Sequence, residues 1–133
     1  MDCIDGKLQL TPQERQRLLA IARDSIAHGL QEQRPLLPDP ATLDGALAVP
    51  RPCFATLQVD GQLRGCIGSL VARDPLGIGA ADYAFRAAFA DPRFPPLPAA
   101  LFPALEIELS VLGDPEPLPC RSREELLARL RPG

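Results

Sequence analysis

The segment with the sequence LRGCIG, residues 63–68, places a guanidinium, a thiol and two glycines in six residues that otherwise have the composition of a β-strand. Glycine within a strand loses side-chain packing and backbone entropy, so Gly65 and Gly68 indicate a bulge or the close approach of another backbone or a ligand. We therefore regard this segment as a candidate binding site, with Gly65 and Gly68 among its binding residues.

Cys66 has two interpretations. A free cysteine most often behaves as a small buried hydrophobe. Alternatively, Cys66 is a reactive thiolate, because Arg64 lies two residues away on the same predicted strand face and a nearby cation lowers the pKa of a thiol. The only histidine, His28, lies far off in the sequence, so a cysteine–histidine relay has no support. Cys66 and Arg64 are thus the candidate catalytic residues of a redox-active, ligand-binding or modified thiol site.

Arg64 also has two interpretations. As a structural residue it forms an ion pair, and the available carboxylates are Glu106, Glu108 and Asp91. As a functional residue it holds a carboxylate or phosphate with its planar guanidinium, which implies a small anionic ligand. We predict the ion pair and, if that pair is buried, a loss of a few kcal/mol of stability when Arg64 is replaced by Met.

Four further residues complete the candidate site. Glu106 and Glu108 lie on one face of a predicted strand, which suits an acid/base pair or a weak metal site, although the sequence favours a solvated strand face. Asp91-Pro92-Arg93-Phe94 ends a helix, with Asp91 and Arg93 placed to pair locally, and its sequence surroundings also suggest a role in a cleft. We therefore add Asp91, Arg93, Glu106 and Glu108 to the binding candidates.

The cysteines predict neither a metal site nor disulfides. Cys3, Cys53, Cys66 and Cys120 include no CxxC pair, whereas zinc sites use closely spaced cysteine and histidine pairs. The acidic start Met1–Asp5 has no signal-peptide pattern, so we expect a cytoplasmic protein with reduced thiols. No cofactor is predicted.

The elements that position these residues follow from local patterns. Thr11, Pro12 and Glu14 form a capping-box helix start, and an apolar stripe continues to His28-Gly29, which predicts a helix over 11–29. Residues 53–59 and 62–70 predict a hairpin around Asp60-Gly61. A two-residue turn pairs Cys66 with Ala55 and places Cys53, Arg64 and Cys66 on one face.

The remaining chain alternates helix and strand. A second helix is predicted from Asp74-Pro75 to Ala90, a half-buried strand over 105–111 and a third helix from Ser122. Residues 35–52 form a proline-rich irregular connection, which is unusually long unless it covers something. The order of elements predicts an α+β fold, an antiparallel sheet with flanking helices, in a single domain over 1–133.

Composition excludes several classes of function. The chain has 133 residues, a net charge of −3, 46% hydrophobic and 23% charged residues, which is globular. No basic stripe or aromatic platform is available for nucleic acid, and no apolar run is long enough to cross a membrane. We therefore predict neither nucleic-acid nor membrane partners.

Three blocks in this order resemble the AMMECR domain family, whose prokaryotic members are called AmmeMemoRadiSam system protein A. The blocks are CFATL with LRGCIGSL, then AAFADPRFPPL, then LEIELSVLGDPEPL. The resemblance implies a two-subdomain α+β fold with the LRGCIG segment near the cleft. Family members continue past the position of Gly133, so we expect the C-terminal part of the family domain to be absent here.

The resemblance implies no established activity, but it associates the prokaryotic members with a Memo-like protein and a radical SAM protein. One hypothesis is therefore a non-catalytic or accessory component acting with those two proteins. The alternative is an enzyme that binds a small anionic substrate in a cleft at the LRGCIG segment, with Cys66 as its reactive group. The sequence favours the accessory role slightly, because it lacks nucleotide loops and metal motifs.

Overall fold

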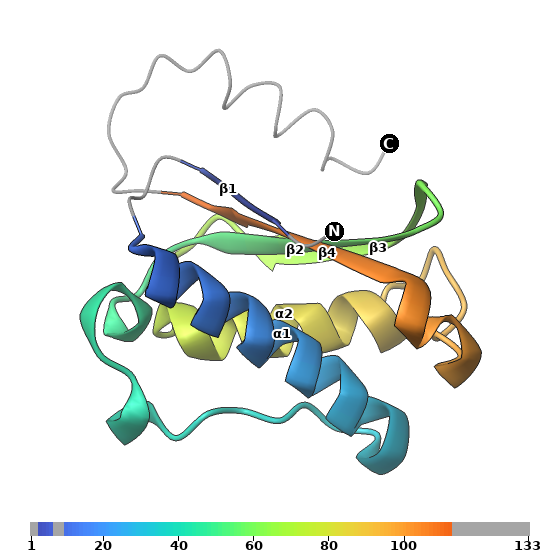
Figure 1. Ribbon diagram of the computed structural model, residues 1–133, viewed down its shortest axis with the longest axis horizontal. Helices are drawn as coiled ribbons and strands as arrows, with labels where there is room; N and C mark the ends of the chain where they lie inside the picture. Colours follow the sequence, from blue (N-terminus) through green and yellow to red (C-terminus); the bar gives the residue numbers. More distant parts are fainter. Residues whose placement is uncertain (1–2, 7–9, 113–133) are drawn as a thin grey trace.

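The computed structural model describes residues 3–6 and 10–112, and these form one four-stranded sheet with two long helices on one side of it (Figure 1). The strands are β1 (Cys3–Gly6), β2 (Cys53–Val59), β3 (Gln62–Ser69) and β4 (Leu105–Val111), and the helices are α1 (Pro12–Glu32) and α2 (Leu76–Phe89). The predicted α+β fold is confirmed. The helix predicted from Ser122 lies outside the described residues.

The sheet has the order β1-β4-β2-β3. β2 is antiparallel to β3, as the predicted hairpin requires, and also to β4, whereas β1 adds to β4 in parallel. No strand was predicted at β1, because four residues carry too little alternation to be distinguished from a loop. β3 is an edge strand, so one row of its backbone groups must find partners outside the sheet.

α1 begins as its sequence predicts. The Thr11 hydroxyl accepts the N–H of Glu14 at 3.0 Å, and the Glu14 carboxylate accepts the N–H of Thr11 at 2.9 Å. A second Glu14 oxygen accepts the N–H of Ala46, and these backbone hydrogen bonds lower the pKa of Glu14. The helix continues past Gly29 to Glu32, because Gly29 is a packing contact with α2 rather than a helix end.

α2 packs against α1 and against β2 and β3 through small side chains. Its buried alanines let backbones approach closely, as predicted; they are Ala80, Ala81, Ala84, Ala87 and Ala88. Pro75 occupies the N-cap position, and no side chain caps the helix there, so the predicted Asp74 cap is wrong. The core consists of these alanines, the apolar stripe of α1 and the helix-facing residues of β2 and β4.

The long connection between α1 and β2 closes one end of this core. It contains the 3-10 turns η1 (Pro40–Thr42) and η2 (Gly45–Ala48). Two of its side chains, Leu43 and Leu47, are buried in the core. The Ser25 hydroxyl donates to the Ala81 carbonyl at 2.9 Å and accepts the N–H of Leu36 at 3.1 Å. The connection therefore covers the helices, which accounts for its length.

Candidate functional site

The β2–β3 hairpin turns where the sequence predicts but has a different register. Asp60 and Gly61 both have positive φ, at 54° and 78°, as a two-residue turn requires. The pairing then shifts, because Gln58 faces Leu63 and Leu57 faces Gly65, which leaves Arg64 as the extra residue of a bulge. Cys66 consequently lies opposite Thr56, and the predicted pairing with Ala55 is wrong.

The bulge reverses the face on which Cys66 lies. Cys53 and Leu57 point to the helices and are buried, whereas Thr56 and Cys66 lie on the face away from α1 and α2, which we call the outer face. Cys66 therefore does not share a face with Cys53. Burial raises the pKa of Cys53 to about 12, so that thiol is a core residue.

The two glycines of the LRGCIG segment are places where backbones meet. A Cβ on Gly65 would collide with the carbonyl of Ala87 in α2, and one on Gly68 would collide with the backbone at Cys53 and Phe54. The predicted close approach is thus confirmed at both positions. At Gly65 it explains the bulge, since the edge strand bends where the last turns of α2 press against it.

The thiol of Cys66 is half-buried and lies 3.3 Å from the Thr56 hydroxyl. Its pKa is raised, with burial as the largest cause, whereas the Thr56 hydrogen bond and the charge of Arg93 act in the opposite direction. Asp91 and Glu108 raise the pKa further. The cation acting on this thiol is therefore Arg93, and the predicted activation by Arg64 is wrong.

Asp91 and Arg93 form an ion pair that holds the main chain of Cys66. Asp91 is 4% exposed; its Oδ2 accepts the N–H of Cys66 at 3.0 Å, and its Oδ1 accepts the N–H and the Nε–H of Arg93, each at 3.0 Å. The Arg93 guanidinium donates to Asp91 Oδ2 at 2.7 Å and to the Cys66 carbonyl at 3.3 Å. The local pairing expected from the sequence is confirmed.

The Asp91–Arg93 pair takes the place of a neighbouring strand at this point of the edge. Because both main-chain groups of Cys66 point outward, Cys66 and Thr56 form a non-hydrogen-bonded pair, in which opposed side chains lie closest. That geometry explains the contact between the thiol and the Thr56 hydroxyl. The hydrogen bonds to Asp91 also hold its pKa down, to about 2, with the side chain of Arg93 as the largest cause.

Arg64 does not form the predicted ion pair. Within the described residues it has no carboxylate partner, and its Nε is buried without a hydrogen bond. Two facts explain this: Asp91 is occupied by Arg93, and Glu106 and Glu108 are on β4, which is separated from β3 by β2. The expected pair required a carboxylate that the sheet order places elsewhere.

Glu106 and Glu108 share the outer face of β4, half-buried, as their alternation predicts. Glu108 faces Thr56, which in turn faces Cys66, so a row of polar side chains crosses the sheet. Thr56 was absent from the sequence-based candidates, because only the register after the bulge reveals it. In the described part of the chain, no three histidine, cysteine or acidic side chains are grouped to hold a metal ion.

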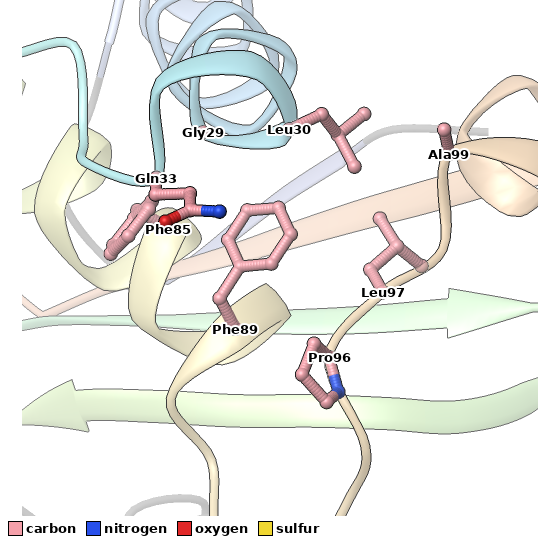
Figure 2. A pocket seen from close by; sticks show the side chains of 8 residues that line it. All are labelled: Gly29, Leu30, Gln33, Phe85, Phe89, Pro96, Leu97 and Ala99. Carbon is pink, nitrogen blue, oxygen red and sulfur yellow. The ribbon is translucent and has the colours of Figure 1, made fainter.

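A half-open cavity of about 510 Å³, with a lining of mixed apolar and polar character, lies apart from this site, where the C-terminal ends of α1 and α2 meet residues 96–99 (Figure 2). It was not predicted, since its walls come from three separate segments.

Neither α1 nor α2 is both long enough and apolar enough to cross a membrane, a finding that applies to the described residues.

Comparison with known proteins gives consistent matches. The chain is 37% identical over 125 residues to a protein of Methanothermobacter thermautotrophicus and 35% identical over 129 residues to one of Methanopyrus kandleri. These matches cover 93% and 94% of this chain but 64% and 61% of the relatives, so the chain spans less than two thirds of their length.

A solved structure supports the same relationship. The crystal structure of an uncharacterized protein from Pyrococcus horikoshii is similar with a TM-score of 0.68 and 30% identity, over 80% of this chain and 57% of that one. The AMMECR1 family model matches residues 19–133, which include the hairpin, the Asp91–Arg93 pair and β4. The chain belongs to the AMMECR1 family.

Proposed function

We propose that this protein is a non-catalytic accessory component that acts by binding other proteins, with a Memo-like protein and a radical SAM protein as the partners to test. The observation that carries the proposal is the state of Cys66. Burial raises the pKa of its thiol, and the Asp91–Arg93 pair occupies its main chain. A thiol that is mostly protonated near neutral pH is a poor nucleophile, which argues for a structural motif over a catalytic one.

The outer face of the sheet supports a binding role. α1 and α2 both lie on the opposite side (Figure 1), and the outer face carries half-buried polar side chains at Thr56, Gln58, Glu106 and Glu108. Glu108 contributes a carboxylate to this face beside Thr56, which suits a partner with a basic surface. Glu106 and Glu108 are therefore proposed as contact residues.

A binding experiment with reversed charges tests this surface. The double variant Glu106→Arg and Glu108→Arg should weaken binding to whichever partner contacts the outer face, mainly through slower association. The matched control is Asp24→Arg with Glu32→Arg, which makes the same change of charge at exposed positions of α1. Equal affinities of the two double variants for both partners would contradict the proposed surface.

A thiol experiment tests the absence of catalysis. In the folded protein, Cys66 should react with a maleimide more slowly than free cysteine at pH 7, and the reaction should accelerate as the pH rises through the thiol range. Cys66→Ser should leave both partner binding and any activity of the reconstituted system unchanged. Loss of that activity with intact binding would instead establish a catalytic thiol.

One observation favours the alternative, an enzyme for a small anionic substrate. The Nε of Arg64 is buried without a hydrogen-bond partner, two residues from Cys66. A carboxylate or phosphate could satisfy such a group. If so, acetate or inorganic phosphate should raise the melting temperature of the native protein but not of Arg64→Met, whereas equal shifts would dismiss the alternative.

A further inference from the structure

The cavity beside α1 and α2 is lined by aromatic and aliphatic side chains and by one amide. Gly29 and Leu30 of α1, Phe85 and Phe89 of α2, and Leu97 provide most of its walls, and Gln33 lies at its edge (Figure 2). Its volume of about 510 Å³ falls within the range of small-molecule sites, which are mostly apolar with a few placed polar groups.

The walls are held in place without a ligand. The Gln33 N–H donates to the Gly29 carbonyl and the Leu97 N–H donates to the Ala88 carbonyl, both at 2.9 Å. The two phenyl rings contact each other with centroids 5.1 Å apart and an angle of 49° between planes. A Cβ on Gly29 would lie 2.7 Å from both rings, so the absence of a side chain there lets the rings sit against α1. A pre-formed cavity limits the ordering cost of binding.

The polar groups at the edge favour hydrogen-bond donors. Gln33 caps α1 in the left-handed conformation, with φ of 63°, and Figure 2 shows its amide beside the Phe89 ring. The last carbonyl groups of a helix have no partner within it, and they carry the negative end of the helix dipole. The last turn of α1 contains no basic residue that would neutralise this end.

We propose that this cavity is a binding site for a small aromatic molecule that carries an amine or another hydrogen-bond donor. The ring would lie against Phe85 and Phe89, and the donor would meet the carbonyl end of α1 and the Gln33 amide, turned so that its oxygen faces the ligand. An aromatic cation also interacts favourably with phenyl faces. This proposal does not rest on the accessory function, because the cavity and the outer face use different residues.

Three probes of similar size test the site by ligand-observed saturation-transfer NMR on the full chain. They are benzylamine, phenylacetate and toluene. Benzylamine should bind roughly two- to fivefold more tightly than phenylacetate, the ratio expected for a charge near a helix end. Toluene should bind too, since most of the contact area is apolar.

A filled cavity provides the decisive variant. Ala99 and Ala100 are both exposed and adjacent in η3 (Ala99–Ala104), but only Ala99 lines the cavity. Ala99→Trp should therefore abolish binding of all three probes, while Ala100→Trp, the matched control, should bind them as the native protein does. Leu30→Trp, on α1, repeats the test independently.

A second variant separates the polar from the apolar contribution. Gln33→Gly removes the amide and keeps the fold, because glycine is favoured at a left-handed helix end. It should weaken benzylamine roughly two- to tenfold, the worth of one hydrogen bond, and leave toluene unchanged.

Three outcomes would overturn the proposal. They are no binding of any probe at millimolar concentration, equal binding by Ala99→Trp and Ala100→Trp, and tighter binding of phenylacetate than of benzylamine. If no probe binds but Ala99→Trp disrupts a complex with a partner protein, the cavity receives a side chain of that partner instead.

Discussion

Two ion pairs of identical composition, one on α2 and one in the loop that follows it, have different roles in this protein. Asp82 and Arg86 pair along α2 at 3.0 Å, with side chains 25% and 56% exposed. Asp91 and Arg93 pair at 2.7 Å, with side chains 2% and 41% exposed, and they also bind the main chain of Cys66. The first pair lies on the surface of α2, whereas the second attaches the loop after α2 to the edge of the sheet.

The comparison shows that the contribution of an ion pair to stability depends on the other hydrogen bonds that its atoms make. Exposed pairs four residues apart contribute little, because water and salt screen them and ordering the side chains costs entropy. A buried carboxylate that accepts main-chain N–H groups is different, since its removal leaves those donors and a guanidinium without partners. Four predictions concern the loop after α2 and the edge strand β3 to which it is attached.

The largest effect is expected from Asp91→Ala. Its loss removes together the charge-assisted hydrogen bonds from the Cys66 N–H, the Arg93 N–H and the Arg93 side chain, so the free energy of unfolding should fall by about 3–5 kcal/mol. Asp82→Ala, the matched control, should change it by less than about 0.5 kcal/mol. Urea unfolding of both variants measures the difference, and similar losses would show that the Asp91–Arg93 pair is an ordinary surface pair.

Gly65→Ala should cause the second-largest loss of stability, because the added Cβ meets the carbonyl of Ala87, and a backbone atom cannot rotate away as a side chain can. We expect a loss of about 3 kcal/mol in unfolding free energy, at the upper end for overpacking. Gly79→Ala is the control: its Cβ would lie 3.5 Å from Tyr83, so the better helix former should stabilise α2 by about 0.5–1 kcal/mol. If Gly65→Ala melts like the native protein, the contact between β3 and α2 does not set the bulge.

Stability should depend on pH through Asp91. Its pKa is held from 3.8 down to about 2 in the folded protein, so its contribution is complete above about pH 4 and is lost as the pH falls toward 2. The shift corresponds to about 2 kcal/mol. Comparing acid unfolding of the native protein with that of Asp91→Asn measures this contribution, and identical pH profiles would assign acid sensitivity to other groups.

Arg64→Met should have the smallest effect. Because Arg64 has no carboxylate partner among the described residues and its Nε is buried without a hydrogen bond, we expect a change within about 1 kcal/mol, in either direction. Arg93→Met should be clearly worse, as it removes the partner of Asp91. A large loss for Arg64→Met would mean that its guanidinium supports the bulge directly.

Local sequence alone determined the elements whose signals lie within a few residues. The capping box of Thr11 and Glu14 predicts the start of α1, strict alternation predicts β4 over 105–111, and Asp60-Gly61 predicts the turn. The pairing of Asp91 with Arg93 was also visible, since the two residues lie two positions apart just after a helix end. In each case, the interacting groups are close along the chain, so no knowledge of the fold is needed.

Tertiary structure alone decided which surfaces those elements present. The bulge at Arg64 arises because α2 presses on Gly65, and this contact places Cys66 opposite Thr56 instead of Ala55. Sheet order separates Arg64 from the carboxylates of β4, and three distant segments build the cavity. A single inserted residue exchanges the two faces of a strand, so the surroundings of Cys66 depend on packing between segments that the local pattern does not contain.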